Sequence, residues 1–142
     1  MRYEVTWEQD GVVMTMHGRV TEDQRQKAHD SIINDTRFDR IRYWIIDTLD
    51  IDAYELDEKS ALKAAGCDIG ASHINAHVLM AFVTINMKQM ENIERFQDYL
   101  SQVNSPWRVE IFSNQDAARR WIANTRAKGT KAKTAPERAA CT

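Results

Sequence analysis

Apolar and polar positions near the start of the chain follow the pattern of two short strands. Residues 2–8 and 12–19 are rich in β-branched and aromatic side chains, and Gln9, Asp10 and Gly11 separate them. An Asp-Gly pair between two such runs is typical of a tight β-turn. The pattern therefore predicts a β-hairpin at the start of the chain.

Apolar residues then recur at helical spacing in four segments. Thr21, with Gln24 three residues later, has the sequence of a capping box, and Asp57 is placed to cap the second helix. Gly66 and Gly70 weaken the later turns of that second helix. The predicted helices span about residues 22–34, 58–72, 88–103 and, after a cap at Ser113 or Asn114, 115–127.

Two further segments are almost continuously apolar, which is the pattern of strands that helices cover on both faces. They are residues 41–47, which contain Trp44, and residues 77–84. We expect them to be neighbouring central strands, with Trp44 or its neighbours deeply buried. Residues 107–112 alternate apolar with charged side chains, which predicts a half-buried strand.

The order of the predicted elements is β-β-α-β-α-β-α-β-α. Strands that alternate with helices favour an α/β fold with a mixed, largely parallel sheet and right-handed crossovers. The 142 residues suit one domain. We assign this domain to residues 1–127. Residues 128–142 carry four basic side chains, one acidic side chain and no apolar periodicity, so we expect a disordered tail there.

Composition narrows the class of protein. Hydrophobic residues make up 43% of the chain and the net charge is −2, which excludes disorder as the main state. Two cysteines, Cys67 and Cys141, do not suit a disulfide-stapled fold and fit a reducing compartment. The chain starts without a leader-like apolar segment, and its longest uncharged stretch, residues 69–87, is interrupted by histidines and asparagines. We therefore expect a cytoplasmic protein without a membrane span.

Six acidic residues and no basic residue fall within twelve positions, and hard cations prefer such carboxylates. An EF-hand loop starting at Asp50 would need an oxygen ligand at Tyr54, a glycine at Glu55 and an acid at Ala61. We therefore expect a solvated loop followed by a helix N-terminus, where acids are favourable, rather than a metal site. The six acids are Asp47, Asp50, Asp52, Glu55, Asp57 and Glu58.

Other motifs of metal sites and of enzymes are incomplete. His73 and His77 have the spacing of a helical zinc site, with Cys67 nearby, but the metalloprotease glutamate is missing between them. Residues 66–70 resemble a nucleophile elbow whose central residue is Asp68 instead of serine or cysteine. We expect no bound metal, no cofactor and no catalytic site.

The charge distribution and the methionines bear on possible ligands. Since the whole chain carries −2 and residues 128–142 carry +3, residues 1–127 carry −5, so a nucleic-acid partner is not expected. Three methionines and two phenylalanines can either line an adaptable apolar pocket or simply belong to the core. These residues are Met80, Phe82, Met87, Met90 and Phe96.

Three segments together resemble a known family. They are GRVTED at residues 18–23, RIRYWIID and DID within residues 40–52, and WRVEIFSNQDAARRWI at residues 107–122. They are similar to STAS-like domains of the sporulation anti-sigma-factor antagonist type, a bacterial group joined to the CRAL-TRIO lipid-transfer superfamily. The resemblance covers residues 2–125. It implies a small mixed sheet packed against helices, no catalysis, and function through binding.

In the antagonists, a kinase partner phosphorylates a serine at the start of the helix after the central strand. The matching region here is residues 52–60, which lack the Asp-Ser-Gly signature and end at Ser60. The leading interpretation is a non-enzymatic module of bacterial regulation that acts through protein contacts, with a homodimer as one arrangement. The alternative is a small carrier of a lipid or other apolar ligand, and a metal-dependent enzyme is a distant third.

The expected contact surface is the acidic segment that follows the central strand, because open α/β sheets usually bind ligands at the carboxyl ends of their strands. Its charge favours a basic partner. The expected contact residues are Asp50, Asp52, Glu55, Asp57, Glu58 and Ser60.

Overall fold

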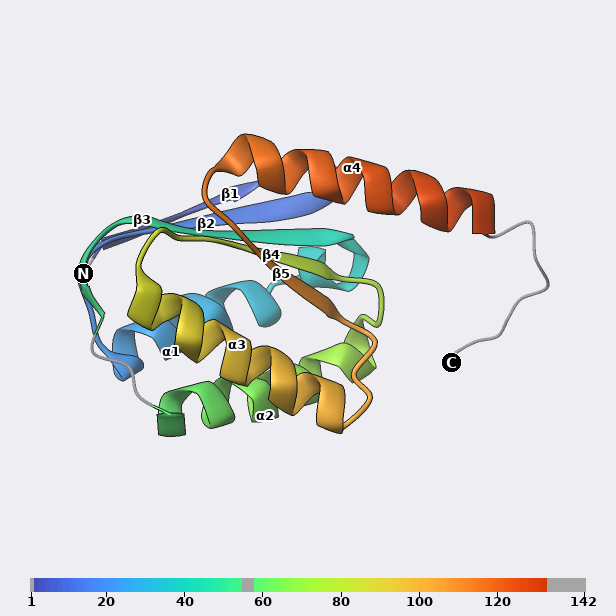
Figure 1. Ribbon diagram of the computed structural model, residues 1–142. Helices are drawn as coiled ribbons and strands as arrows, with labels where there is room; N and C mark the ends of the chain where they lie inside the picture. Colours follow the sequence, from blue (N-terminus) through green and yellow to red (C-terminus); the bar gives the residue numbers. More distant parts are fainter. Residues whose placement is uncertain (1, 55–57, 133–142) are drawn as a thin grey trace.

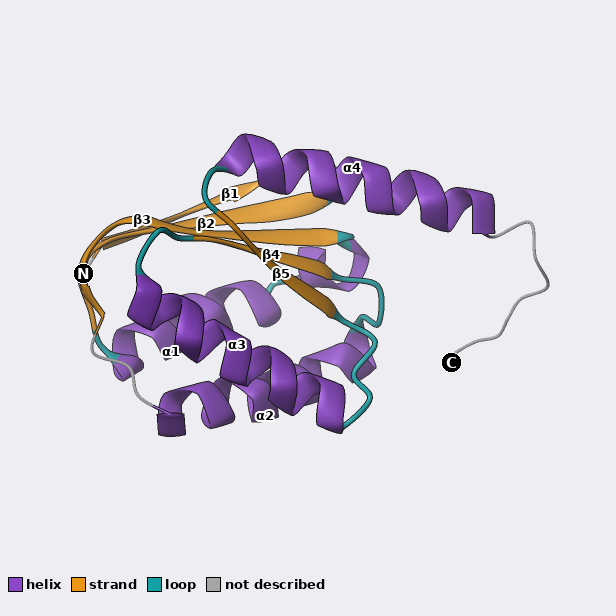
Figure 2. Ribbon diagram, in the orientation of Figure 1, coloured by secondary structure: helices purple, strands orange, loops and turns teal. Residues whose placement is uncertain are grey.

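The computed structural model describes residues 2–54 and 58–132, and the side chains at 54, 58 and 129–132 lie outside this description. The described chain forms one five-stranded sheet with helices on both faces (Figures 1 and 2). The strands are β1 (Arg2–Trp7), β2 (Gly11–Val20), β3 (Tyr43–Tyr54), β4 (Leu79–Val83) and β5 (Arg108–Phe112). The helices are α1 (Glu22–Ile33), the 3-10 helix η1 (Thr36–Arg40), α2 (Glu58–Ile74), α3 (Met87–Gln102) and α4 (Gln115–Ala132).

The strands lie in the sheet in the same order as in the chain, β1-β2-β3-β4-β5. The β1–β2 hairpin is antiparallel and every other pair is parallel. This confirms the predicted α/β class and the mixed, largely parallel sheet. Residues Tyr43 to Asp47 pair with Leu79 to Val83, so the two apolar strands are neighbours as expected. Trp44, between them, is fully buried.

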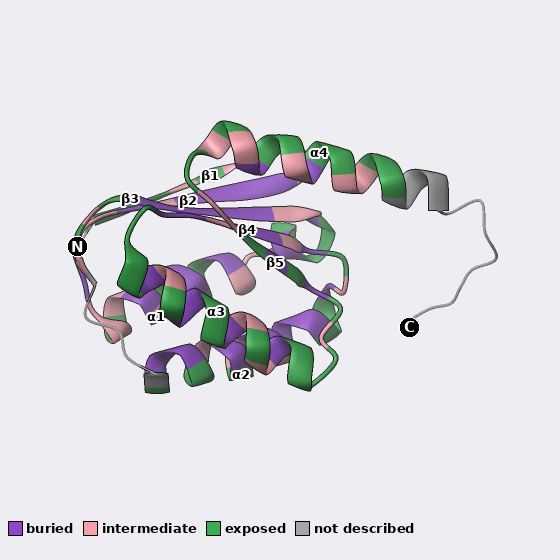
Figure 3. Ribbon diagram, viewed as in Figure 1, coloured by how far each residue is buried: buried purple, intermediate pink, exposed green. Residues whose placement is uncertain are grey.

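The helices divide unequally between the two faces of the sheet (Figure 1). Helices α1, α2 and α3 cover one face, because successive crossovers of one hand that step in one direction place their helices on the same side. The larger core cluster lies there and includes Met16, Trp44 and Phe96. Helix α4 covers the other face, where Ala118 and Ile122 belong to the smaller cluster. Figure 3 shows buried positions concentrated on the sheet and on the inward helix surfaces.

Polar side chains cap the helices. Gln24 N–H donates to Thr21 Oγ1 at 3.4 Å and the Gln24 side chain accepts from Thr21 N–H at 3.2 Å, which confirms the predicted capping box. Asn114 Oδ1 accepts from Ala117 N–H at 2.8 Å, so Asn114 rather than Ser113 caps α4. These bonds satisfy amides that have no partner within the helix.

Three elements are longer than the sequence predicts. Strand β3 continues to Tyr54 instead of ending near residue 47, and α2 passes through both glycines to Ile74. Helix α4 runs to Ala132, past residue 127, where the predicted domain ends. Residues 133–142 lie outside the described part. No helix among the described residues is long and apolar enough to cross a membrane.

A polar cluster ties the hairpin and β3 to α4. The Glu8 carboxylate accepts two hydrogen bonds from the Arg119 guanidinium, at 2.9 and 3.0 Å, and a third from the Tyr43 hydroxyl. The bonds from Arg119 lower the pKa of Glu8, whereas burial and the nearby carboxylate raise the pKa of Tyr43. A Cβ at Gly11 would lie 2.2 Å from Tyr43 Cε1, so the ring occupies the space that only glycine leaves open.

Candidate functional site

The carboxyl ends of β3 and β4 diverge and leave a groove between them. Pairing of the two strands ends at Asp47 and Val83, after which the chain of β4 turns into α3. Strand β3 continues beside β2 as far as Tyr54. The groove has a volume of about 340 Å³ and is lined by residues of 48–53 on β3 and of 84–89 on the connection to α3 and its first turn.

Side-chain hydrogen bonds hold both walls where the strands separate. Thr48 Oγ1 donates to the Val83 carbonyl at 2.7 Å, and Leu49 N–H donates to Asp47 Oδ1 at 3.0 Å. On the opposite wall, Thr84 Oγ1 donates to Gln89 Oε1 at 2.8 Å. These bonds satisfy polar groups that the end of the ladder would otherwise leave buried, so the mouth of the groove is a built feature of the fold.

The surface at the groove combines exposed apolar side chains with acids. Leu49, Ile85 and Met87 are 40%, 69% and 74% exposed, and Leu49 and Ile85 both line the groove. Asp50 and Asp52 are exposed beside them on β3. Apolar side chains that stay in contact with water, bordered by charges, are typical of a surface that binds another macromolecule.

The predicted contact residues separate into three groups. Asp52 lines the groove, and Asp50 lies next to it on β3, where its Oδ2 is 3.1 Å from His17 Nδ1. Ser60 is 8% exposed and faces a different space, the inner cavity between the sheet and α2. The third group lies outside the described residues or side chains: Glu55, Asp57 and Glu58.

The three acids of the predicted cluster whose side chains the structure describes, Asp47, Asp50 and Asp52, do not form one site. Asp47 is buried at the end of the β3–β4 ladder, where its carboxylate accepts bonds from Leu49 N–H and from the Gln115 side chain at 2.7 Å. Asp50 and Asp52 are instead exposed. In the described ranges, 2–54 and 58–132, no three His, Cys, Asp or Glu residues gather closely enough to hold a metal ion.

The histidine pair read as a zinc candidate straddles the end of a helix. His73 lies in the last turn of α2, and His77 follows after the helix has ended at Ile74, so the two do not share a helical face. Both side chains are exposed. Cys67 lies further back on α2 and contacts the Gln26 side chain at 3.7 Å.

A second space, the inner cavity, lies between the sheet and the three helices of the larger core. Its volume is about 60 Å³. Of the residues expected to line an apolar pocket, Met80, Phe82 and Phe96 line it, whereas Met87 is exposed near the groove. An engineered apolar cavity of about 150 Å³ holds benzene, and drug-sized ligands occupy about 300–1,000 Å³. The inner cavity is therefore too small for a lipid.

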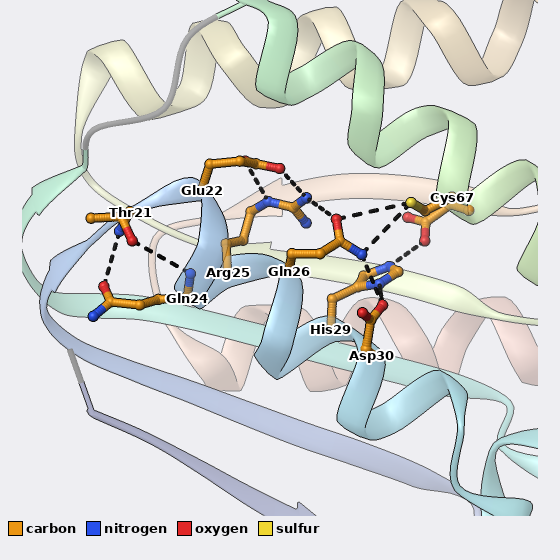
Figure 4. Close-up of polar contacts among 9 residues, drawn as sticks. Thr21, Glu22, Gln24, Arg25, Gln26, His29, Asp30 and Cys67 are labelled. Atoms are coloured by element: carbon orange, nitrogen blue, oxygen red, sulfur yellow. Dashed lines mark hydrogen bonds and ion pairs between the residues drawn. The ribbon is translucent and has the colours of Figure 1, made fainter.

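Polar side chains from α1 and α2 contact one another (Figure 4), and Arg25, His29 and Asp68 line the inner cavity. Arg25 donates to both carboxylate oxygens of Glu22, at 2.9 and 3.2 Å. His29 Nε2 lies 2.5 Å from Asp68 Oδ1, and these two residues are only 4% and 2% exposed. The His29 ring stacks on Trp44 with 5.2 Å between centroids. The arrangement is a buried imidazole–carboxylate pair, with Arg25, Ser60 and Asn92 as further buried polar residues in the lining of the same cavity.

Sequence reasoning did not find this pair. His29 lies three residues before the buried Ile32, and Asp68 lies three residues after the buried Ala65, so both fall on the apolar face of a helix. A charged residue on such a face is the signal that predicts a buried partner. The sequence does not, however, indicate which polar residue that partner is, because 39 positions separate the two.

Comparison with known proteins identifies the architecture. No protein-family model and no curated protein sequence matches the chain. A solved structure does match: an uncharacterised protein of the DUF3478 family with a SpoIIAA-like fold, from Shewanella loihica PV-4. The two chains are 14% identical, the match covers 85% of this chain and 92% of the other, and the TM-score is 0.50. This chain has a SpoIIAA-like fold. The STAS-like resemblance of the sequence is thereby confirmed at the level of the fold.

The sheet of this SpoIIAA-like fold has no position at which the strand order reverses. The rule that places binding crevices at such a reversal, which supported the expected contact surface, therefore does not apply in that form. The groove instead arises because β3 extends seven residues, from Thr48 to Tyr54, beyond the end of its pairing with β4. Strand length, not strand order, produces the opening at the carboxyl edge.

Proposed function

We propose that this protein is a non-enzymatic STAS-like module of bacterial regulation that acts through protein contacts at the groove between β3 and α3. The observation that carries the proposal is the exposure of Leu49, Ile85 and Met87 around this groove. Removal of apolar surface from water is favourable by about 25 cal/mol per Å², before the entropic costs of association are subtracted. A partner that covers these side chains removes their apolar surface from water, and this burial favours the complex.

The charge of the groove adds selectivity for the partner. Asp50 and Asp52 are exposed at its rim, and the nearby His17 is shared between Asp50 and Glu4 at 3.1 and 3.0 Å. A basic partner surface is attracted to this rim and associates faster, and the attraction weakens as salt rises. The acidic rim therefore favours a partner with lysine or arginine at its contact surface.

The proposed contact does not use serine phosphorylation as its switch. Ser60 matches the position that the antagonist resemblance implies, in the first turn of α2. Its side chain faces the inner cavity, and the residue is 8% exposed. A kinase needs the hydroxyl at the surface, so phosphorylation there would require α2 to move away from the sheet. We place the contact at the groove instead.

The inner cavity gives the carrier alternative its one supporting observation, a lining of methionine and phenylalanine side chains. Its volume of about 60 Å³ is well below that of the cavities that hold even a single aromatic ring. A carrier would have to open the packing between the sheet and α2. The groove needs no such rearrangement, which is why we favour the protein-contact function.

The test compares two pairs of surface substitutions. Immobilised wild type, the double variant Ile85→Ser with Met87→Ser, and the control Leu62→Ser with Val103→Ser are used to capture proteins from the native host, with quantification by mass spectrometry. Leu62 and Val103 are 55% and 50% exposed and lie outside the groove, so the control removes apolar surface of similar kind.

The expected result is a partner that wild type and control retain equally and that the groove variant loses by tenfold or more. Native mass spectrometry of the purified protein completes the test. A partner held equally by all three proteins would remove the groove from the mechanism. A lipid retained in stoichiometric amount would instead favour the carrier.

A further inference from the structure

We infer that the partner contributes an extended peptide segment, with a lysine or arginine, that adds as a further strand to the open edge of β3 inside the groove. This inference rests on the proposed function and specifies the form of the partner at that site. Strand addition to an exposed sheet edge is a general mode of peptide recognition, in which backbone bonds supply affinity and side-chain pockets supply specificity.

The first argument is the unpaired edge of β3. On one side, β2 accompanies the strand as far as the pair Val20–Tyr54. On the other side, pairing with β4 stops at Asp47–Val83. Backbone N–H and C=O groups of a strand point alternately to its two sides. Within the part of the chain that the structure describes, those of residues 50–53 that point away from β2 have no strand to bond.

The second argument is the wall that faces this edge. The β4–α3 connection and the first turn of α3 run along the groove and present Ile85, Asn86 and Gln89 to it. An incoming strand therefore finds backbone donors and acceptors on one side and an apolar side chain on the other. The volume of about 340 Å³ falls within the range typical of binding sites.

The third argument is charge. Among the described residues that line the groove, Asp52 is the only charged one, and the exposed Asp50 lies two positions before it on β3. Opposite charges on neighbouring strands stabilise the pairing. A lysine or arginine on the incoming segment, placed across from Asp52, satisfies this condition.

The same charge argues against a second copy of this chain as the occupant. A two-fold dimer that joined two β3 edges would place identical segments opposite each other. Asp50 and Asp52 of one copy would then lie across from the same acids of the other copy, and like charges directly opposite destabilise a strand pair. The edge therefore favours a partner of opposite charge.

The test uses the full chain and synthetic peptides of defined chemistry. A positional-scanning library of N-acetylated, C-amidated octapeptides is screened for binding, and the best binder is studied with ¹⁵N-labelled protein. We expect that peptide to contain lysine or arginine and to slow hydrogen exchange at outward amides of residues 50–53. Asp52→Lys should weaken its binding tenfold or more, whereas Val103→Lys, on an exposed site outside the groove, should change it less than twofold.

Backbone bonding is tested separately from charge. Two versions of the best peptide, methylated on alternate backbone nitrogens in either register, remove the donors that strand addition needs, and at least one should lose binding. In the protein, Asp52→Ala removes the charge alone, and a further loss of binding in Asp52→Pro reports the missing backbone donor, since Asp52 has no partner in the register with β2. Retained folding of this variant is checked by circular dichroism.

Three results would overturn the inference. They are a library without any peptide that protects residues 50–53, equal binding of both methylated peptides, and protection that grows with protein concentration alone, which would identify a second copy as occupant. The proposed function can survive any of them. If Ile85→Ser with Met87→Ser still abolishes capture of the native partner, the groove remains the contact site and only strand addition is excluded.

Discussion

At the scale of single residues, the pair formed by His29 and Asp68 is the feature of the core that depends most on each polar atom having a hydrogen-bond partner. Both side chains are almost fully buried, and their bond at 2.5 Å joins α1 to α2. His29 Nδ1, at 3.7 Å from Asp30 Oδ1, and Trp44 Nε1 are buried without a hydrogen-bond partner in the described chain. Buried polar groups of this kind lower stability unless each finds a partner, so the local arrangement tolerates little change.

We therefore predict that His29→Ala lowers the free energy of unfolding by about 3–5 kcal/mol, because it leaves the Asp68 carboxyl buried and unpaired. The double variant His29→Leu with Asp68→Leu removes both polar partners and should recover most of that loss. Denaturant unfolding followed by tryptophan fluorescence measures both. A single variant within 1 kcal/mol of wild type would mean that Asp68 reaches water or another partner.

At the scale of elements, α2 contains two glycines that disfavour a helix, and its packing maintains the helical conformation. Its buried positions are small, among them Ala61, Ala65 and Ala71, and this allows close approach to the neighbouring helix α3. Gly66 and Gly70 lie at exposed positions within the helix, where a Cβ would meet no atom within 4 Å. They add backbone freedom to the unfolded chain and contribute no packing.

From this we expect Gly66→Ala to raise the free energy of unfolding by about 0.5–1 kcal/mol. Gly18→Ala is the matched control at a position that is equally open but has a φ of 76°, where alanine is strained. It should lower stability by about 1 kcal/mol or more. Thermal melts of both variants check the pair, and a destabilising Gly66→Ala would indicate that α2 is not a continuous helix there.

The elements that sequence predicts well are those with a local signal. The capping box at Thr21, the turn at Gly11 and the two apolar strands each depend on residues close in the chain, and all are present. The extension of β3 past Asp47 was missed although Leu49 to Ala53 alternate apolar with acidic residues, which is a strand pattern, because the acids were interpreted as a solvated loop. The groove, which requires this extension, was therefore only partly foreseen through Asp50 and Asp52.

At the scale of the whole molecule, the local stability of the backbone against opening is expected to decrease along β3, from Trp44 toward Ala53. Trp44 to Asp47 lie between β2 and β4 with helices on both faces, whereas Asp50 to Ala53 have a strand on one side only in the described chain. Backbone amides of a strand that is paired on both sides and covered by helices exchange only when the whole protein unfolds. Amides at an unpaired sheet edge exchange through local opening.

Native-state hydrogen exchange should accordingly show β4 and residues 44–47 among the slowest amides of the chain. The outward amides of residues 50–53 should exchange at least a hundredfold faster, as expected for local opening. Equal protection along the whole of β3 would contradict this gradient. Fast exchange in β4 would contradict the assignment of β4 as a central strand.

The sequential order of the strands has a consequence for how the chain is made. Each strand pairs with the one synthesised just before it, so a nascent chain never has to wait for a distant segment to complete an earlier pair. The hairpin emerges first, and β3, β4 and β5 then each extend an edge that already exists. Until α4 follows at the end, Ile45 and Val83 on the opposite face lack the side chains that bury them in the finished protein. Helix α4, which leaves the ribosome after all five strands, thus closes the second core, and a chain that stops before it carries an open apolar face.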